Sequence, residues 1–248
     1  MTLSPPQPSF RLDGKTALVT GAGRGIGAAA ASVFAQAGAA VTLCARTSSE
    51  VEATASEIRA AGFKADAFAL DVSDIATMRR EVQARGPFDI LLNNAGTNRI
   101  RSITEVTEED YDAVLNLNLK SALFVAQAVV KGLLDAKKPG SIINVSSSGA
   151  LFPAPRYGPY AGAKAALNAL TTVFAREFAP KVRVNTLSAG PFLTDIAQHW
   201  PEESKRTWRN AAGRAGQPAE VVTTALYLAS AASSYTTGSL IRVDGGLY

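Results

Sequence analysis

Short apolar runs alternate with longer segments of helical periodicity along nearly the whole chain. The apolar runs contain few polar residues, which is typical of strands buried on both faces of a parallel sheet. The segments between them are rich in alanine and long enough to cross from one parallel strand to the next. The predicted strands are Thr16–Thr20, Ala40–Arg46, Lys64–Leu70, Ile90–Asn93, Ser141–Ser146, Val182–Leu187 and Leu240–Val243. The predicted helices are Ile26–Ala37, Ser49–Ala61, Ile75–Ala84, Glu108–Leu134, Pro159–Ala179 and Ala219–Ala229.

Right-handed crossovers convert this order into an α/β fold, a doubly wound parallel sheet of about seven strands with helices on both faces. No linker or repeat interrupts the alternation, so we expect one domain over residues 11–248 after a flexible arm of residues 1–10. The least regular stretch is residues 190–216, which contains His199, Trp200 and Trp208. It is expected to form a lid over a ligand, or else a surface helix with aromatic anchors.

Composition and charge narrow the class of protein. The 248 residues suffice for one large core, and 19% charged residues are too few for disorder across the body. One Cys cannot form an internal disulfide, and one Cys with one His cannot build a Cys/His zinc site, so no metal is expected. The net charge of +4 is spread along the chain rather than gathered in blocks, which favours a small anionic ligand over nucleic acid.

The predicted location is the cytoplasm, without membrane contact. Residues 1–10 lack the basic and apolar regions of a secretory signal. No apolar run reaches the roughly 18 to 20 residues that a membrane span needs.

A glycine-rich segment from Thr20 to Gly27 directly follows the first predicted strand and opens the first predicted helix. Glycines at such a junction let the backbone turn sharply and approach a pyrophosphate at the positive end of the helix. This placement favours a Rossmann-type dinucleotide site over a purely structural turn. The candidate cofactor residues of this segment are Gly21, Arg24, Gly25, Ile26 and Gly27.

The end of the second predicted strand indicates which dinucleotide binds. An NAD site normally offers an acid about 20 residues beyond the glycines, yet no acid lies between Gly27 and Glu50. Arg46 stands there instead and could meet a 2′-phosphate, with Arg24 as a second cation. NADP(H) is therefore the predicted cofactor, the alternative being that both arginines lie in solvent.

Tyr160 and Lys164 are four residues apart and so share one face of a predicted helix. A phenol titrates near 10, and a nearby ammonium stabilises the phenolate and lowers its pKa toward neutrality. The strand Ser141–Ser146 runs into Ser147 and Ser148 at the sheet edge where α/β proteins bind ligands. Tyr157 lies close by but has an alanine four residues on.

At this point the sequence resembles the short-chain dehydrogenase/reductase family over nearly its whole length. Several independent motifs occur in the family's order. They are Thr20-Gly21-x-x-x-Gly25-x-Gly27, Asp71-Val72, Asn93-Asn94-Ala95-Gly96, Asn118, Ser147 thirteen residues before Tyr160, Tyr160-x-x-x-Lys164, and Val243-Asp244-Gly245-Gly246.

The resemblance implies a role for each matching residue. Tyr160 would be the general acid in reduction and the base in oxidation, and Lys164 would tune it and hold the nicotinamide ribose. Ser147 would hydrogen-bond the substrate carbonyl, and Asn118 would hold a water in a proton relay. The remaining implied cofactor contacts are Asp71 and Val72 at the adenine, Asn94, Ala95 and Gly96 along its path, and Phe192 and Thr194 at the carboxamide.

Two of these assignments carry an open alternative, and one family motif is altered. Asp71 could be a turn residue only, and Asn118 a buried amide that braces the sheet. The family's Pro-Gly after the sixth strand is Ala189-Gly190 here, a departure that should loosen the turn before the lid.

The expected reaction is hydride transfer between NADP(H) and a ketone or secondary alcohol. Arg99, Arg101 and Arg156 would make the substrate rim basic, which favours an anionic substrate such as a keto sugar acid or a 3-oxoacyl thioester, unless these arginines are merely solvated. The alternative function is a non-catalytic dinucleotide sensor. The resemblance also implies a homotetramer packed through the helices near 108–134 and 159–179, although those faces could instead cover the sheet.

Overall fold

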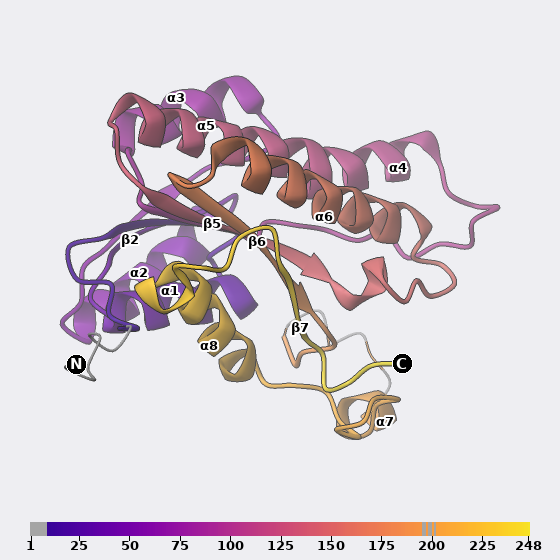
Figure 1. Cartoon of the computed structure of the whole chain (residues 1–248). Helices are drawn as coiled ribbons and strands as arrows, with labels where there is room; N and C mark the ends of the chain where they lie inside the picture. The colour runs from indigo at the N-terminus through magenta and orange to yellow at the C-terminus, as the bar shows by residue number, and fades with distance from the viewer. Residues whose placement is uncertain (1–8, 195–196, 198–199, 201) are drawn as a thin grey trace, which may run out of the picture.

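A computed structural model describes residues 9–194, 197, 200 and 202–248. Most of the predicted arm, and His199 in the predicted lid, lie outside the described residues. Within them, seven strands form one parallel sheet in the order β3-β2-β1-β4-β5-β6-β7 (Figure 1). The strands are β1 (Thr16–Thr20), β2 (Ala40–Ala45), β3 (Ala65–Ala69), β4 (Ile90–Asn93), β5 (Gly140–Ser147), β6 (Val182–Ala189) and β7 (Leu240–Val243).

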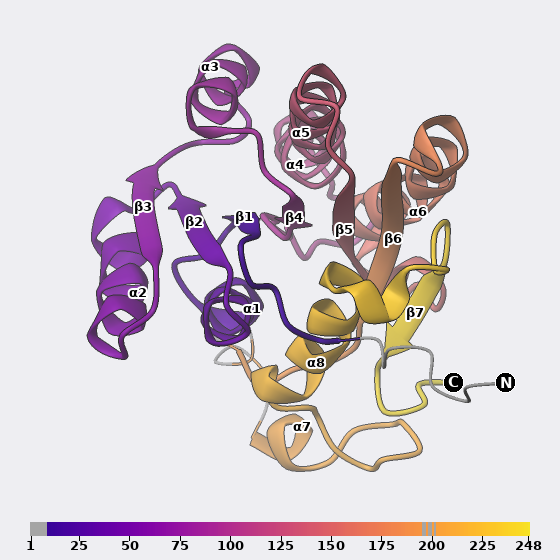
Figure 2. The same cartoon turned by 60° about the vertical axis from the view of Figure 1, so that its left-hand side comes forward.

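Helices cover both faces of the sheet (Figure 2). One face carries α1 (Gly25–Gln36), α2 (Ser48–Ala60) and α8 (Pro218–Ala229). The other carries α3 (Ile75–Arg85), α4 (Glu108–Leu115), α5 (Ser121–Asp135) and α6 (Gly158–Phe178). Two apolar clusters fill the two interfaces, one centred on Phe34 and Leu43 and the other on Met78 and Leu133. The predicted doubly wound Rossmann-type fold is confirmed.

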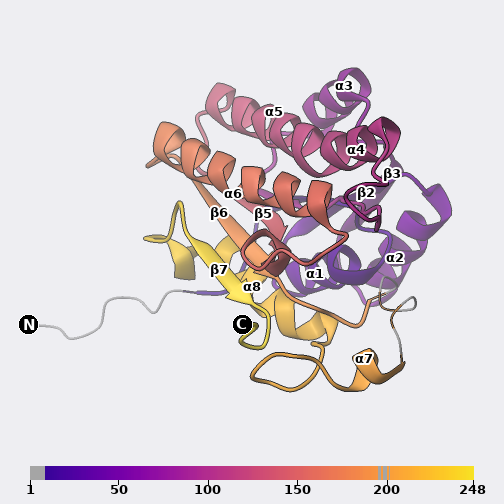
Figure 3. The same ribbon diagram turned by 90° about the vertical axis from the view of Figure 1, so that its right-hand side faces the viewer.

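Short helices complete the fold. The five-residue helix α7 (Glu202–Arg206) lies within the predicted lid, on the same side of the sheet as α8 (Figure 3). Two 3-10 turns follow β5 and α8, namely η2 (Ser148–Ala150) and η4 (Ala231–Ser233).

The predicted helix Glu108–Leu134 is interrupted by one π-helical turn, η1 (Asn116–Lys120). The buried Asn118 amide donates to the carbonyls of Val114 at 2.9 Å and Thr97 at 2.7 Å, so it ties the turn to the segment after β4. Hydrophobic periodicity could not predict the turn, because its cause is a contact with a distant segment.

One helix is long and apolar enough to cross a membrane when its mean hydropathy is considered, although polar residues interrupt its apolar run. The continuous helix from Glu108 to Asp135 has 28 residues and passes that test by length and composition. In the fold, its residues Val114, Val125, Val129 and Leu133 are buried in the protein's own core. The same length and composition therefore serve a core helix here.

A chain of buried polar side chains fastens the central strands to the α5–α6 layer. The Asn93 amide at the end of β4 donates to Asn144 Oδ1 on β5 at 3.1 Å and to the Ala122 carbonyl of α5 at 2.7 Å. The Asn144 amide in turn donates to Thr171 Oγ1 on α6 at 2.9 Å, and Thr171 donates to the Leu167 carbonyl. These bonds fix α6 against β5, and with it Tyr160 and Lys164.

We predict that Thr171→Val lowers the free energy of unfolding by about 1 to 3 kcal/mol, because the isosteric change leaves the buried Asn144 amide without its acceptor. Urea unfolding measures the effect. Thr172→Val is the matched control: the neighbouring hydroxyl is partly exposed and makes only a 3.5 Å contact with the Asn168 carbonyl. Equal losses for the two variants would contradict the prediction.

Candidate active site

The glycine-rich loop packs tightly against the segment that follows β4. Gly21 and Gly25 have φ values of 64° and 59°, in the left-handed region that favours glycine. A Cβ at Gly21 would lie 2.9 Å from the Ala95 Cα atom, and one at Gly27 only 2.3 Å from the Gly21 carbonyl oxygen. The Asn94 amide donates to the Gly21 carbonyl at 3.1 Å. The loop therefore fits against this segment only because Gly21 and Gly27 have no side chain.

The beginning of α1 fits an anionic ligand. Its first turn holds no acidic residue, and the N-cap residue Arg24 makes no side-chain capping bond. The backbone N–H groups of this turn therefore point out of the helix without a side-chain acceptor from the cap, beside the glycine loop. Ile26 is partly buried and anchors this turn to the core.

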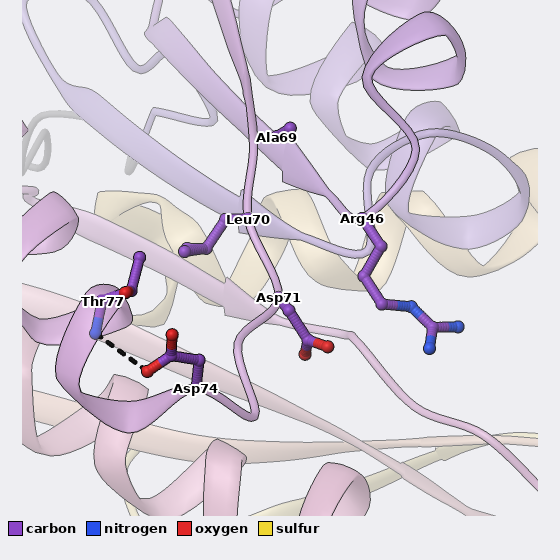
Figure 4. A pocket seen from close by; sticks show the side chains of 6 residues that line it. All are labelled: Arg46, Ala69, Leu70, Asp71, Asp74 and Thr77. Carbon is purple, nitrogen blue, oxygen red and sulfur yellow. Dashed lines mark hydrogen bonds between the residues drawn. The ribbon is translucent and has the colours of Figure 1, made fainter.

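Arg46 lies just past the end of β2, at a cavity of about 260 Å³ (Figure 4). Asp71 also lines this cavity, and its Oδ1 accepts from the Ser73 N–H at 2.9 Å and the Ser73 hydroxyl at 2.7 Å. Asp71 is thus a turn residue that also faces a cavity. Val72 is a buried core residue, which leaves its backbone for any ligand contact. The other lining residues are Ala69, Leu70, Asp74 and Thr77.

The four predicted catalytic residues converge at the carboxyl ends of β4 and β5. Ser147 is the last residue of β5, which is longer than predicted and pairs with β6 as far as Ala189. Lys164 is buried and donates to the Val145 carbonyl at 2.8 Å, and its Nζ lies 5.8 Å from the centre of the Tyr160 ring. A Cβ at Gly96 would lie 2.7 Å from Asn118 Oδ1 and 3.7 Å from Lys164 Nζ. Lys164 and Asn118 therefore flank the same glycine.

Burial shifts the pKa values of both Lys164 and Tyr160. Desolvation lowers the pKa of Lys164 from 10.5 to about 8. It also raises the pKa of the Tyr160 phenol, while a hydrogen bond with Ser147 acts in the opposite direction and the nearby Tyr157 adds to the rise. The sequence-based expectation that Lys164 lowers the pKa of Tyr160 is thus not the net result in the protein alone, because the cost of a buried phenolate is larger.

The first residues of the predicted lid lie close to the glycine loop. The Thr194 methyl would lie 3.5 Å from a Cβ at Gly25. Phe192 is buried, with its ring against Gly216, so the side chain belongs to the core. Trp200 and Trp208 pack on each other, with ring centroids 4.6 Å apart.

One of the three arginines of the predicted basic rim is already paired with an acid in the structure. Arg101 forms an ion pair with the largely buried Asp110 of α4 and donates to it. Arg99 and Arg156 are exposed, and Arg156 has a left-handed φ of 73°.

Two residues near the candidate site were not predicted from the sequence. Glu50 lies against Gly23 and 3.6 Å from Arg24, a contact that only the packing of α2 on the loop creates. Asn210 ties the lid to the C-terminal segment by donating to the Asp244 carbonyl at 3.0 Å. The resemblance already marked Asp244, but no local pattern marks Asn210.

Comparison with known proteins identifies the family. The family described as enoyl-(acyl carrier protein) reductase matches residues 21–248. A 3-oxoacyl-(acyl-carrier-protein) reductase of Thermotoga maritima is 38% identical over 96% of this chain and 99% of its own. The gluconate 5-dehydrogenase of Gluconobacter oxydans is 35% identical over 96% of both chains.

Solved structures agree. The gluconate 5-dehydrogenase of Burkholderia cenocepacia, in complex with NADP and tartrate, has a TM-score of 0.89 at 38% identity and 96% coverage of both chains. A 3-oxoacyl-(acyl-carrier-protein) reductase of Agrobacterium tumefaciens with NADP bound also has a TM-score of 0.89, at 36% identity, covering 96% of this chain and 95% of its own. As the sequence motifs predicted, this chain belongs to the short-chain dehydrogenase/reductase family of oxidoreductases.

Proposed function

We propose that this chain is an NADP(H)-dependent oxidoreductase that transfers a hydride between the nicotinamide and a ketone or secondary alcohol. The observation that carries the proposal is the meeting of Ser147, Tyr160, Lys164 and Asn118 beside the glycine loop. The catalytic unit would be a single domain over residues 11–248, with a lid near 190–216 and an arm of residues 1–10.

The cofactor assignment draws on the fit of the chain's own residues. The glycine loop at the start of α1 suits a pyrophosphate, and Arg46 with Arg24 suits a 2′-phosphate. Two similar structures, the gluconate 5-dehydrogenase and the 3-oxoacyl reductase above, contain NADP. When bound, the nicotinamide supplies or accepts the hydride.

We assign the proton chemistry to Tyr160. Its hydroxyl would protonate the carbonyl oxygen during reduction, and its phenolate would remove the proton of the alcohol during oxidation. Ser147 Oγ would donate to the same oxygen and hold it in place. Lys164 has donor capacity beyond its bond to Val145, which would serve the nicotinamide ribose, and its charge would stabilise the phenolate. Asn118 would hold a water that passes protons toward Lys164.

The remaining contacts are those that the family resemblance implies. The adenine would lie at Asp71 and the backbone of Val72, and the cofactor would run along Asn94, Ala95 and Gly96. Thr194 beside Gly25 and the backbone of Phe192 would meet the carboxamide.

An anionic substrate remains the favoured class. With Arg101 engaged by Asp110, the recognition of a carboxylate or phosphate would fall to Arg99 and Arg156. The named relatives include both a sugar-acid dehydrogenase and a 3-oxoacyl reductase, so both substrate types belong in the first assays. No specific observation favours the sensor function.

We further propose a cytoplasmic homotetramer that packs through α4, α5 and α6. Tyr111 on α4 and Val173 on α6 are each about half exposed, at 50% and 53%, on the helices that the family uses for assembly. Light scattering should give the mass of four chains, and the mass of one chain would contradict this assembly.

Tyr160→Phe should reduce turnover by about 100- to 10,000-fold, because it removes the proton donor, while NADPH binding stays intact. NADPH oxidation is measured over a panel of ketones, keto acids and 3-oxoacyl thioesters, and binding by calorimetry. Tyr157→Phe is the matched control and should keep most of the turnover. A wild-type protein that binds NADPH but reduces nothing in the panel would favour the sensor instead.

Lys164→Met should abolish turnover yet raise the free energy of unfolding by about 1 to 3 kcal/mol at pH 7, because it removes a buried charge. The folded pKa of about 8 lies below the ordinary value of 10.5, so the cost of the buried charge is complete below pH 8. It shrinks as the pH rises from 8 to 10.5, and the advantage of the variant should shrink with it. Urea unfolding at pH 7 and pH 10 tests this, with the exposed Lys131→Met as control.

A further inference from the structure

We propose that Glu50 is a specificity-determining residue for the cofactor. Its carboxylate competes with a 2′-phosphate for Arg24 and so narrows the preference for NADPH over NADH. This inference rests on the cofactor site of the proposed function.

The position of Glu50 is set by the packing of α2 on the glycine loop. Glu50 is the third residue of α2 and the acidic residue of its first turn. A Cβ at Gly23 would lie 3.0 Å from Glu50 Cβ and 3.2 Å from its Oε2 atom. One turn further along, the Thr54 hydroxyl donates to the Gly23 carbonyl at 3.1 Å. The carboxylate therefore faces the loop.

The carboxylate lies within reach of Arg24. Glu50 Oε1 is 3.6 Å from Arg24 Nη1, and the two side chains are 40% and 65% exposed. An ion pair this long and this exposed is weak and exchanges readily with other partners. A phosphate monoester carries about 1.5 to 2 negative charges at neutral pH and can displace the single charge of a carboxylate.

Arg46 lies two residues before α2 begins, at the cavity next to the same helix end. Near the beginning of α2, Glu50 thus lies beside Arg24, and the nearby Arg46 lines a cavity together with Asp71. The Glu50 carboxylate partly neutralises the positive charge of Arg24, which weakens the attraction of a 2′-phosphate to this site. It also repels that phosphate directly. A ribose 2′-hydroxyl has no charge and can donate to a carboxylate. Glu50 therefore opposes one cofactor and tolerates the other.

The test compares dissociation constants of NADPH and NADH by calorimetry. Glu50→Gln should bind NADPH about three- to tenfold more tightly than the wild type, with little change for NADH. Glu52→Gln is the matched control, because it makes the same charge change on the same helix but its carboxylate pairs with Arg59. An equal gain in both variants would overturn the role of Glu50.

A double-mutant cycle with Arg24→Gln tests whether Glu50 acts on the cofactor through Arg24. The gain from Glu50→Gln should vanish in the Arg24→Gln background, and a full gain there would overturn the competition for Arg24. Melting temperatures check the fold of each variant. If Glu50→Gln fails to fold, Glu50→Asp, which withdraws the charge from Arg24, should give a smaller gain for NADPH, and no gain overturns the proposal.

The binding constants of the wild type distinguish failure of the NADP(H) assignment from failure of the Glu50 proposal. Tighter binding of NADH than NADPH by the wild type would overturn the NADP(H) assignment itself. A wild-type preference for NADPH, together with an unchanged ratio in Glu50→Gln, would overturn the role of Glu50 alone.

Discussion

The cross-strand bond between Asn93 and Asn144 is the contact on which the site depends most. The two residues are directly opposite each other in the parallel register of β4 and β5, and both are buried. Buried amides cost free energy unless they are hydrogen-bonded, so these residues tolerate very few arrangements of their neighbours. Their hydrogen bonds reach Ala122 on α5 and Thr171 on α6. These bonds fix the position of α6, which carries Tyr160 and Lys164, relative to Ser147 on β5.

Parallel pairing places the chemistry at one edge. All seven strands run the same way, so the glycine loop, the Asn94 segment, Ser147 and the lid all leave the sheet at its carboxyl end. Ala95 packs on Gly21 of the glycine loop, and the next residue, Gly96, lies beside the buried ammonium of Lys164. The same burial that lowers the pKa of Lys164 makes its charge effective, because few waters screen it.

The C-terminal segment holds residues 210–212 of the predicted lid in place. Asn210 donates to the Asp244 carbonyl, and Ala211 and Ala212 donate to the carbonyls of Gly246 and Gly245. A Cβ at Gly190 would lie 2.5 Å from Asp244 Cα, so the lid's first turn needs a glycine there. Gly190 and residues 210–212 therefore both contact the segment after β7, and the alanine at position 189 leaves the close approach of Gly190 intact.

Periodicity and spacings of a few residues were enough to predict the strands, their parallel class, the glycine loop and the Tyr160–Lys164 pair. Tertiary structure alone decided the π turn at Asn118, the pairing of Arg101 with Asp110, the raised pKa of Tyr160 and the approach of Glu50 to Arg24. Each of these depends on burial or on a contact between different elements. No acid lies between Gly27 and Glu50 in the sequence, and only the packing of α2 on Gly23 brings the Glu50 carboxylate back to the loop.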